Sequence, residues 1–191
     1  MSAQPMVIRN ERVSDRDPAM IDQWTMRDGT HVLIRSIRPE DEPLMIAFHE
    51  GLSGRSVYMR YFESLSFKSR TAHERLSRIC FADPQQEIVL VGVNTDPNTG
   101  AQSILAVGRL SKLSDGKTAE IAVLVSDDYQ GRGLGTELMK RLVQAATTQG
   151  IHRITAEMLR DNTLMQSLAK KLGFHLYQLK DPRSVRAAMD L

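Results

Sequence analysis

The sequence contains little of what marks several classes of protein. Its 191 residues include one cysteine, Cys80, so no disulfide can form within the chain, and a reducing cytoplasm is the simplest setting. No apolar run approaches the roughly 18 residues that a membrane-spanning helix needs. The N-terminus lacks a basic segment followed by an apolar core, so we expect no signal peptide. The formal net charge is +2 and the basic residues are spread along the chain, which gives no case for nucleic-acid binding.

The rest of the composition is that of an ordinary soluble domain. Hydrophobic residues make up 41% of the chain and charged residues 25%, and the length suits one domain with a sizeable core. Residues 1–27 mix charges and proline with few periodic apolar residues. We therefore expect a flexible N-terminal arm over residues 1–27 and one domain over residues 28–191. Cys80 has no histidine or acid beside it in sequence, which favours a buried structural thiol over a nucleophile.

Hydrophobic periodicity and turn signals predict a mixed α/β order of elements. A strand over residues 31–37 precedes a helix that starts near Pro39, and a second helix is predicted over residues 68–81. Three further strands end at residues 93, 113 and 125 and form an antiparallel meander. Helices over residues 133–149 and 162–172 then alternate with strands over residues 151–158 and 174–179. A final edge strand is expected over residues 185–191.

The stretch AEIAVLVSDDYQGRGLG, residues 119–135, carries the most chemical information. An apolar strand leads through a polar turn into glycines and then into a helix with leucines every four residues. Free N–H groups and the helix dipole at such a helix start favour an anion, and Arg132 could add a charge-assisted contact. The alternative is a turn that only starts a surface helix. The Rossmann and P-loop patterns do not fit, because the glycines are spaced as Gly131, Gly133 and Gly135 and no Gly-Lys-Ser/Thr follows.

Two motifs in order resemble the GCN5-related N-acetyltransferase (GNAT) family. The first, Gln130-x-x-Gly133-x-Gly135 after an apolar strand, looks like the family's acyl-CoA pyrophosphate loop. The second runs from Asn162 to Gly173-Phe174, and the resemblance covers roughly residues 31–191. It implies a mixed, mostly antiparallel sheet of six to seven strands, flanked by helices, with a splayed central strand pair. It also implies acetyl-CoA as co-substrate and no metal.

The resemblance implies a set of cofactor-binding residues. The strand before the loop would pair with the pantetheine arm, and the loop would hold the pyrophosphate. Asn162 would either contact the CoA arm or act only as a helix cap, and this is left open. The predicted cofactor-binding residues are Val123, Leu124, Val125, Gln130, Gly131, Arg132, Gly133, Leu134, Gly135, Thr136 and Asn162.

Acetyl transfer to an amine needs a base, because a lysine has a reference pKa near 10.4. Glu120 is the candidate, since it is a carboxylate within an apolar strand, where burial would raise its pKa. The alternative is a strand-end glutamate that reaches water, but the resemblance implies a base here. A backbone N–H of residues 123–125 could stabilise the oxyanion. The family's usual tyrosine acid is replaced by Ala169, and Tyr129 and Tyr177 are weak substitutes.

A narrower resemblance points to the acceptor. Residues 37–43, 56–62 and 73–81 resemble the acetyltransferase domain of bacterial protein lysine acetyltransferases. This implies a protein lysine as substrate, with acyl-CoA synthetases the leading type. We expect no counterpart of the domain that is often fused to it in those proteins, and we expect regulation to fall to residues 1–27 or a separate partner. A small-molecule amine acetyltransferase and a non-catalytic acyl-CoA-binding regulator are the alternatives, and a homodimer is left open.

Overall fold

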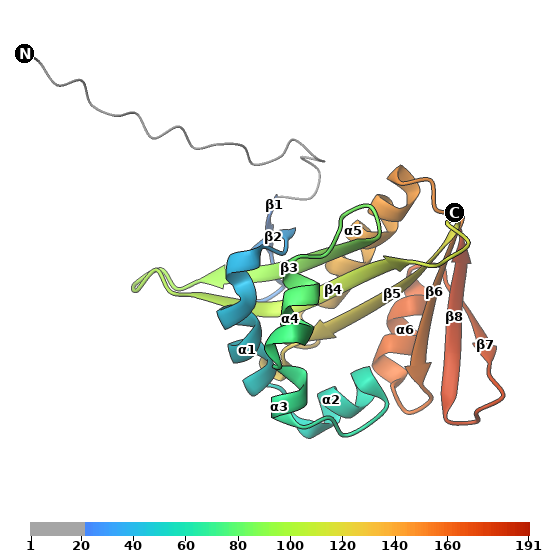
Figure 1. The fold of residues 1–191 in the computed structure, drawn as a ribbon, viewed down its shortest axis with the longest axis horizontal. Helices are drawn as coiled ribbons and strands as arrows, with labels where there is room; N and C mark the ends of the chain where they lie inside the picture. Colours follow the sequence, from blue (N-terminus) through green and yellow to red (C-terminus); the bar gives the residue numbers. More distant parts are fainter. Residues whose placement is uncertain (1–21) are drawn as a thin grey trace, which may run out of the picture.

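The computed structural model describes residues 22–191, which form one sheet with helices on both faces (Figure 1). The sheet has eight strands in the order β1-β2-β3-β4-β5-β6-β8-β7. The strands are β1 (Asp22–Thr25), β2 (His31–Ser36), β3 (Glu87–Thr95), β4 (Gln102–Lys112), β5 (Thr118–Val125), β6 (Arg153–Leu159), β7 (His175–Gln178) and β8 (Ser184–Asp190).

Neighbouring strands are antiparallel with one exception, the pair β5–β6, which is parallel. The predicted meander is confirmed, because β3, β4 and β5 pair in sequence order. The helices are η2 (Pro39–Asp41), α1 (Glu42–Glu50), α2 (Gly54–Tyr61), α3 (Phe67–Arg70), α4 (His73–Cys80), η3 (Asp127–Tyr129), α5 (Leu134–Thr148) and α6 (Thr163–Lys171).

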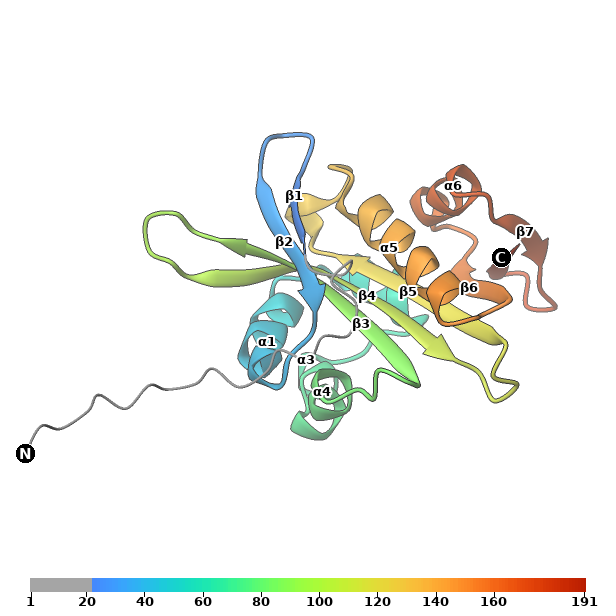
Figure 2. The same cartoon turned by 90° about the horizontal axis from the view of Figure 1, so that it is seen from above.

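Each face of the sheet has its own apolar core. Figure 2 shows α5 on one side of the central strands and α1, α3 and α4 on the other. Leu134, Leu138 and Leu142 of α5 are fully buried against the first face, because their spacing of four places them on one side of the helix. Met45 and Phe48 of α1 pack on the opposite face. The helix predicted from the leucine spacing is therefore confirmed, and it fixes where the glycine loop lies.

The structure corrects three expectations about the elements. The eighth strand, β1, lies within the predicted arm; residues 1–21 of that arm lie outside the described residues. The helix predicted over residues 68–81 is two helices, because Ala72 is extended (φ −55°, ψ 129°) and starts α4. The final strand is not at an edge, since β8 lies between β6 and β7. The short and mostly exposed β7 forms the edge instead.

Cys80 is buried at the end of α4, as the sequence predicted. Burial, followed by the charges of Asp41 and Glu42, raises the pKa of its thiol from 9.0 to about 11. A thiol with such a pKa is a poor nucleophile at neutral pH. None of the helices in the described part of the chain is long and apolar enough to cross a membrane.

Candidate active site

The parallel strands β5 and β6 separate after a short paired segment. Their register runs through Thr118↔Arg153, Ala119↔Ile154 and Glu120↔Thr155 and stops there. On its other side β5 stays paired with β4 as far as Val125. Residues 121–125 of β5 therefore have an open edge toward β6, and backbone groups on such an edge need another partner. This is the splayed central pair that the sequence resemblance implied.

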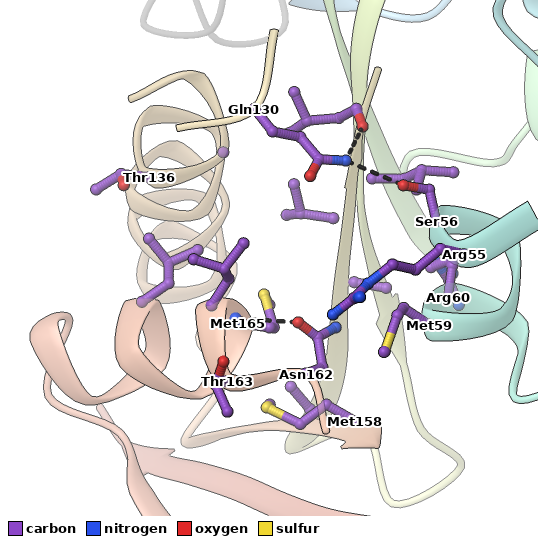
Figure 3. A pocket seen from close by; sticks show the side chains of 18 of the residues that line it. Arg55, Ser56, Met59, Arg60, Gln130, Thr136, Met158, Asn162, Thr163 and Met165 are labelled. Carbon is purple, nitrogen blue, oxygen red and sulfur yellow. Dashed lines mark hydrogen bonds between the residues drawn. The ribbon is translucent and has the colours of Figure 1, made fainter. Parts of the chain in front are cut away.

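A cavity of about 630 Å³ occupies the gap between the two strands. Figure 3 shows that α2 borders it on one side with Arg55, Met59 and Arg60, and that α6 borders it on the other with Thr163 and Met165. Its volume lies in the range of pockets that hold cofactors and drug-sized ligands. The predicted site residues that line it are Glu120, Val123, Leu124, Val125, Gln130, Gly131, Gly133, Gly135, Thr136 and Asn162.

The glycine loop places the start of α5 at this cavity. Gly131 and Gly133 have positive φ values of 74° and 99°, a conformation that strains residues with a side chain. Gly135 lies against the open strand, since a Cβ there would be 3.3 Å from Cγ2 of Val125. The first N–H groups of α5 have no carbonyl one turn behind them. The loop therefore brings free backbone donors and a positive dipole end to the cavity.

Two of the predicted residues do not line the cavity. Arg132 forms an ion pair with Asp28, and its guanidinium lies 5.0 Å from the ring centre of Tyr129. Leu134 is fully buried in the core beneath the loop. The guanidinium expected to meet a phosphate is thus held by a carboxylate in this structure. The side chain of Leu134 packs in the core, so only its backbone N–H is left to take part in anion binding by the loop.

Comparison with known proteins gives the family. Residues 31–175 match the model of the acetyltransferase (GNAT) domain. The chain belongs to the GNAT acetyltransferase family. It is 30% identical over 155 residues to acetyltransferase PA5475 of Pseudomonas aeruginosa, covering 80% of this chain and 81% of that one. It is 32% identical over 149 residues to acetyltransferase Pat of Mycolicibacterium smegmatis, covering 78% of this chain but only 42% of Pat.

The fold agrees with a solved GNAT structure. The GNAT domain of S. lividans PAT superposes with a TM-score of 0.80 at 24% identity, covering 93% of this chain and all of that domain. The chain is therefore an N-acetyltransferase of the GNAT fold, and its co-substrate is acetyl-CoA. The cavity fits this co-substrate, because an open strand edge and a glycine-lined helix start meet in it. In residues 22–191 there is no cluster of three or more metal-ligating side chains.

Glu120 lies where β5 and β6 separate in this GNAT domain. Its side chain is exposed where the strands part, so the expected burial is not found and, of the two possibilities left open, the glutamate that reaches water describes its surroundings. Its charge acts on the guanidinium of Arg60 of α2, which also lines the cavity. Burial lowers the pKa of Arg60, as do the charges of Arg109 and Arg75, whereas Tyr61 and Glu120 oppose that shift. A carboxylate open to solvent and a partly desolvated guanidinium thus share one end of the cavity.

Gln130 has a bridging role that the sequence did not reveal. Its Nε2 donates to the carbonyl oxygen of Val125 at 3.1 Å and to Oγ of Ser56 at 3.0 Å (Figure 3). Ser56 in turn donates to Asp127 at 2.8 Å. Asp127 also accepts from the backbone N–H of Ser53 at 2.9 Å and from its Oγ at 2.7 Å. This network fixes the start of α2 to the segment between β5 and the glycine loop.

Asn162 caps α6, because its Oδ1 accepts the N–H of Met165 at 3.2 Å. It also lines the cavity, so its Nδ2 is available to a ligand, and contact with the CoA arm stays a prediction. Ala169 is fully buried in the core and does not reach the cavity. Of the two substitute tyrosines, Tyr129 lines the cavity, whereas Tyr177 lies exposed on edge strand β7.

Proposed function

We propose that this GNAT enzyme transfers the acetyl group of acetyl-CoA to a lysine side chain of a protein, with acyl-CoA synthetases as the leading acceptor type. The observation that carries this proposal is the exposed position of Glu120 at the point where β5 and β6 part. A base that lies open to solvent can be reached by a side chain presented on another protein's surface. The similarity to acetyltransferase Pat supports acetyl transfer, and the resemblance of residues 37–43, 56–62 and 73–81 to bacterial protein lysine acetyltransferases favours a protein lysine as the acceptor.

In this proposal the donor lies along the open edge of β5. Residues Val123, Leu124 and Val125 offer backbone groups to the pantetheine arm, and the loop from Gln130 to Gly135, followed by Thr136, receives the pyrophosphate. Gln130 acts mainly by holding the carbonyl of Val125, so that β5 keeps its position beside the cavity. Asn162 adds a side-chain amide from the opposite wall.

Glu120 acts as the base. A lysine is protonated at neutral pH, so a proton must leave before nitrogen can attack the thioester carbon. Glu120 accepts that proton, directly or through water, and the free amine then attacks the carbonyl carbon to form the N–C bond. The resulting tetrahedral adduct breaks its C–S bond, and the nitrogen releases its second proton to solvent. A backbone N–H of residues 123–125 stabilises the negative charge on the carbonyl oxygen. Because Ala169 offers no acid, the sulfur leaves as a thiolate and takes its proton from solvent.

A second candidate acceptor is a small amine that carries its own acidic group. Arg60 favours this alternative, because its guanidinium lines the cavity near Glu120 and forms no ion pair within residues 22–191. A partly desolvated arginine is well suited to a carboxylate or phosphate. A screen of acceptors separates the two candidates.

The test is transfer of labelled acetyl from acetyl-CoA to a mixture of metabolic enzymes and to a panel of small amines. Glu120→Gln should lower turnover by about 10²- to 10⁴-fold while acetyl-CoA binding stays nearly intact. The matched control is Glu157→Gln, which also removes a carboxylate from the cavity wall. Unchanged turnover in Glu120→Gln would remove this residue from the mechanism. Label on small amines alone would refute the protein acceptor, and binding without any transfer would favour a regulator.

A further inference from the structure

The turn between β1 and β2 lies directly against the glycine loop. Its backbone is fixed by a bond from the N–H of Met26 to the carbonyl of Thr30 at 2.8 Å, and Met26 is buried. The next residue, Arg27, donates its N–H to the carbonyl oxygen of Arg132 at 3.3 Å. The residues of this turn are thus held at a defined place beside the loop.

The side chain of Arg27 extends over the loop as well. A Cβ built on Gly133 would lie 3.7 Å from Nε of Arg27 and 3.4 Å from Cη2 of Trp24. Arg27 lines the cavity together with Gly131 and Gly133. Its neighbour Asp28 is engaged elsewhere, because it forms the ion pair with Arg132. Arg132, which the sequence suggested as the anion contact, is therefore paired with Asp28, whereas Arg27 borders the cavity.

The groups that Arg27 joins at this end of the cavity favour an anion. Within the described range 22–191, Arg27 forms no ion pair with a carboxylate. It stands beside a helix N-terminus, which also favours negative charge. The other arginines that line the cavity, Arg55 and Arg60, come from α2 on the opposite wall (Figure 3). Arg27 is thus the guanidinium placed to meet a group held by the loop.

We propose that Arg27 binds the pyrophosphate of acetyl-CoA and that the β1–β2 turn is part of the cofactor site. This inference rests on the proposed placement of the pyrophosphate in the glycine loop. A guanidinium matches phosphate oxygens through charge-assisted, often bidentate hydrogen bonds. Arg27 lies before residue 31, where the match to the family model begins, so neither loop motif nor family pattern pointed to it.

The experiment compares two donors, acetyl-CoA and acetyl-pantetheine, because the second lacks the pyrophosphate and the nucleotide. Arg27→Ala should raise the Kd and KM for acetyl-CoA by about 5- to 20-fold and leave kcat little changed. The same variant should leave the KM for acetyl-pantetheine unchanged. Arg27→Lys, which keeps the charge but loses the planar fork, should recover part of the affinity. Arg78→Ala removes an exposed arginine of α4 and controls for net charge.

The outcomes separate this inference from the proposed function. If the unaltered protein transfers acetyl groups and Arg27→Ala binds acetyl-CoA normally, Arg27 has no role and only this inference fails. Equal losses with both donors would show a general effect on the loop and overturn the phosphate contact. If the unaltered protein does not bind acetyl-CoA at all, the proposed placement of the donor fails, and this inference fails with it. Thermal unfolding curves of Arg27→Ala and Arg27→Lys that match the curve of the unaltered protein show that both variants are folded.

Discussion

A buried histidine should make the stability of this enzyme sensitive to mild acid. His49 of α1 is 2% exposed, and its Nδ1 has no hydrogen-bond partner among the described residues. Burial, followed by the charges of Arg70, Arg75 and Arg60, lowers its pKa from 6.5 to about 4. The folded state therefore holds His49 neutral at a pH where the unfolded chain binds a proton. Its contribution to stability is complete above pH 6.5 and is lost as the pH falls from there toward 4.

The size of the effect follows from the two pKa values. Between pH 7 and pH 5 the free energy of unfolding should fall by about 2 kcal/mol, because the unfolded state gains the proton and the folded state does not. The aspartates with lowered pKa act at lower pH, since the stability that they add is lost only below their ordinary value of 3.8. They are Asp28, Asp96, Asp115, Asp127 and Asp181.

Urea unfolding at pH 7, 6 and 5 measures this loss. His49→Leu should abolish most of the difference between pH 7 and pH 5, whatever its effect at pH 7. His152→Gln is the matched control, because His152 is exposed before β6, and it should keep the difference seen in the unaltered protein. If the free energy of unfolding falls equally between pH 7 and pH 5 in the unaltered protein and in His49→Leu, the reasoning is refuted.

Two further stability effects follow from ion pairs and hydrogen bonds. Asp41→Ala should lower the free energy of unfolding in urea by about 3–5 kcal/mol, because Arg35 is buried and both of its terminal nitrogens lie 2.7 Å from Asp41 oxygens. Breaking an exposed pair such as Arg78–Glu74 should lower it by less than about 1 kcal/mol. Asp127→Ala should lower the free energy of unfolding by about 1–3 kcal/mol and loosen the start of α2, because three hydrogen bonds are lost. An unchanged rate of proteolysis at the start of α2 would contradict this.

The parts of the fold that could be predicted are those with a local cause. The glycines at 131 and 133 and the leucine spacing of α5 act within a few residues, so the loop and the helix start were placed correctly. Strand β1 was missed because its four residues are mostly exposed and depend on pairing with β2. The interior place of β8 is equally a property of the assembled sheet.

The candidate site shows the same division. Glu120 stands among apolar residues in sequence, which predicts burial, yet the separation of β5 and β6 leaves it exposed. Arg132 is held by Asp28, which is 104 positions away in the chain, and no local pattern reveals such a pair. The prediction of the cavity-lining residues relied on a shared motif. The residues that it missed, Arg27, Ser56 and Asp127, reach the site through tertiary contacts.

The packing of Trp24 on Gly133 gives the enzyme a built-in optical probe. Trp24 is the chain's single tryptophan, so all of the indole fluorescence comes from one half-buried ring beside the glycine loop. Any change in the loop's water or charge on filling the cavity alters the surroundings of that ring. The emission of the unlabelled protein can therefore report, in real time, how fast a donor arrives at the loop and leaves it.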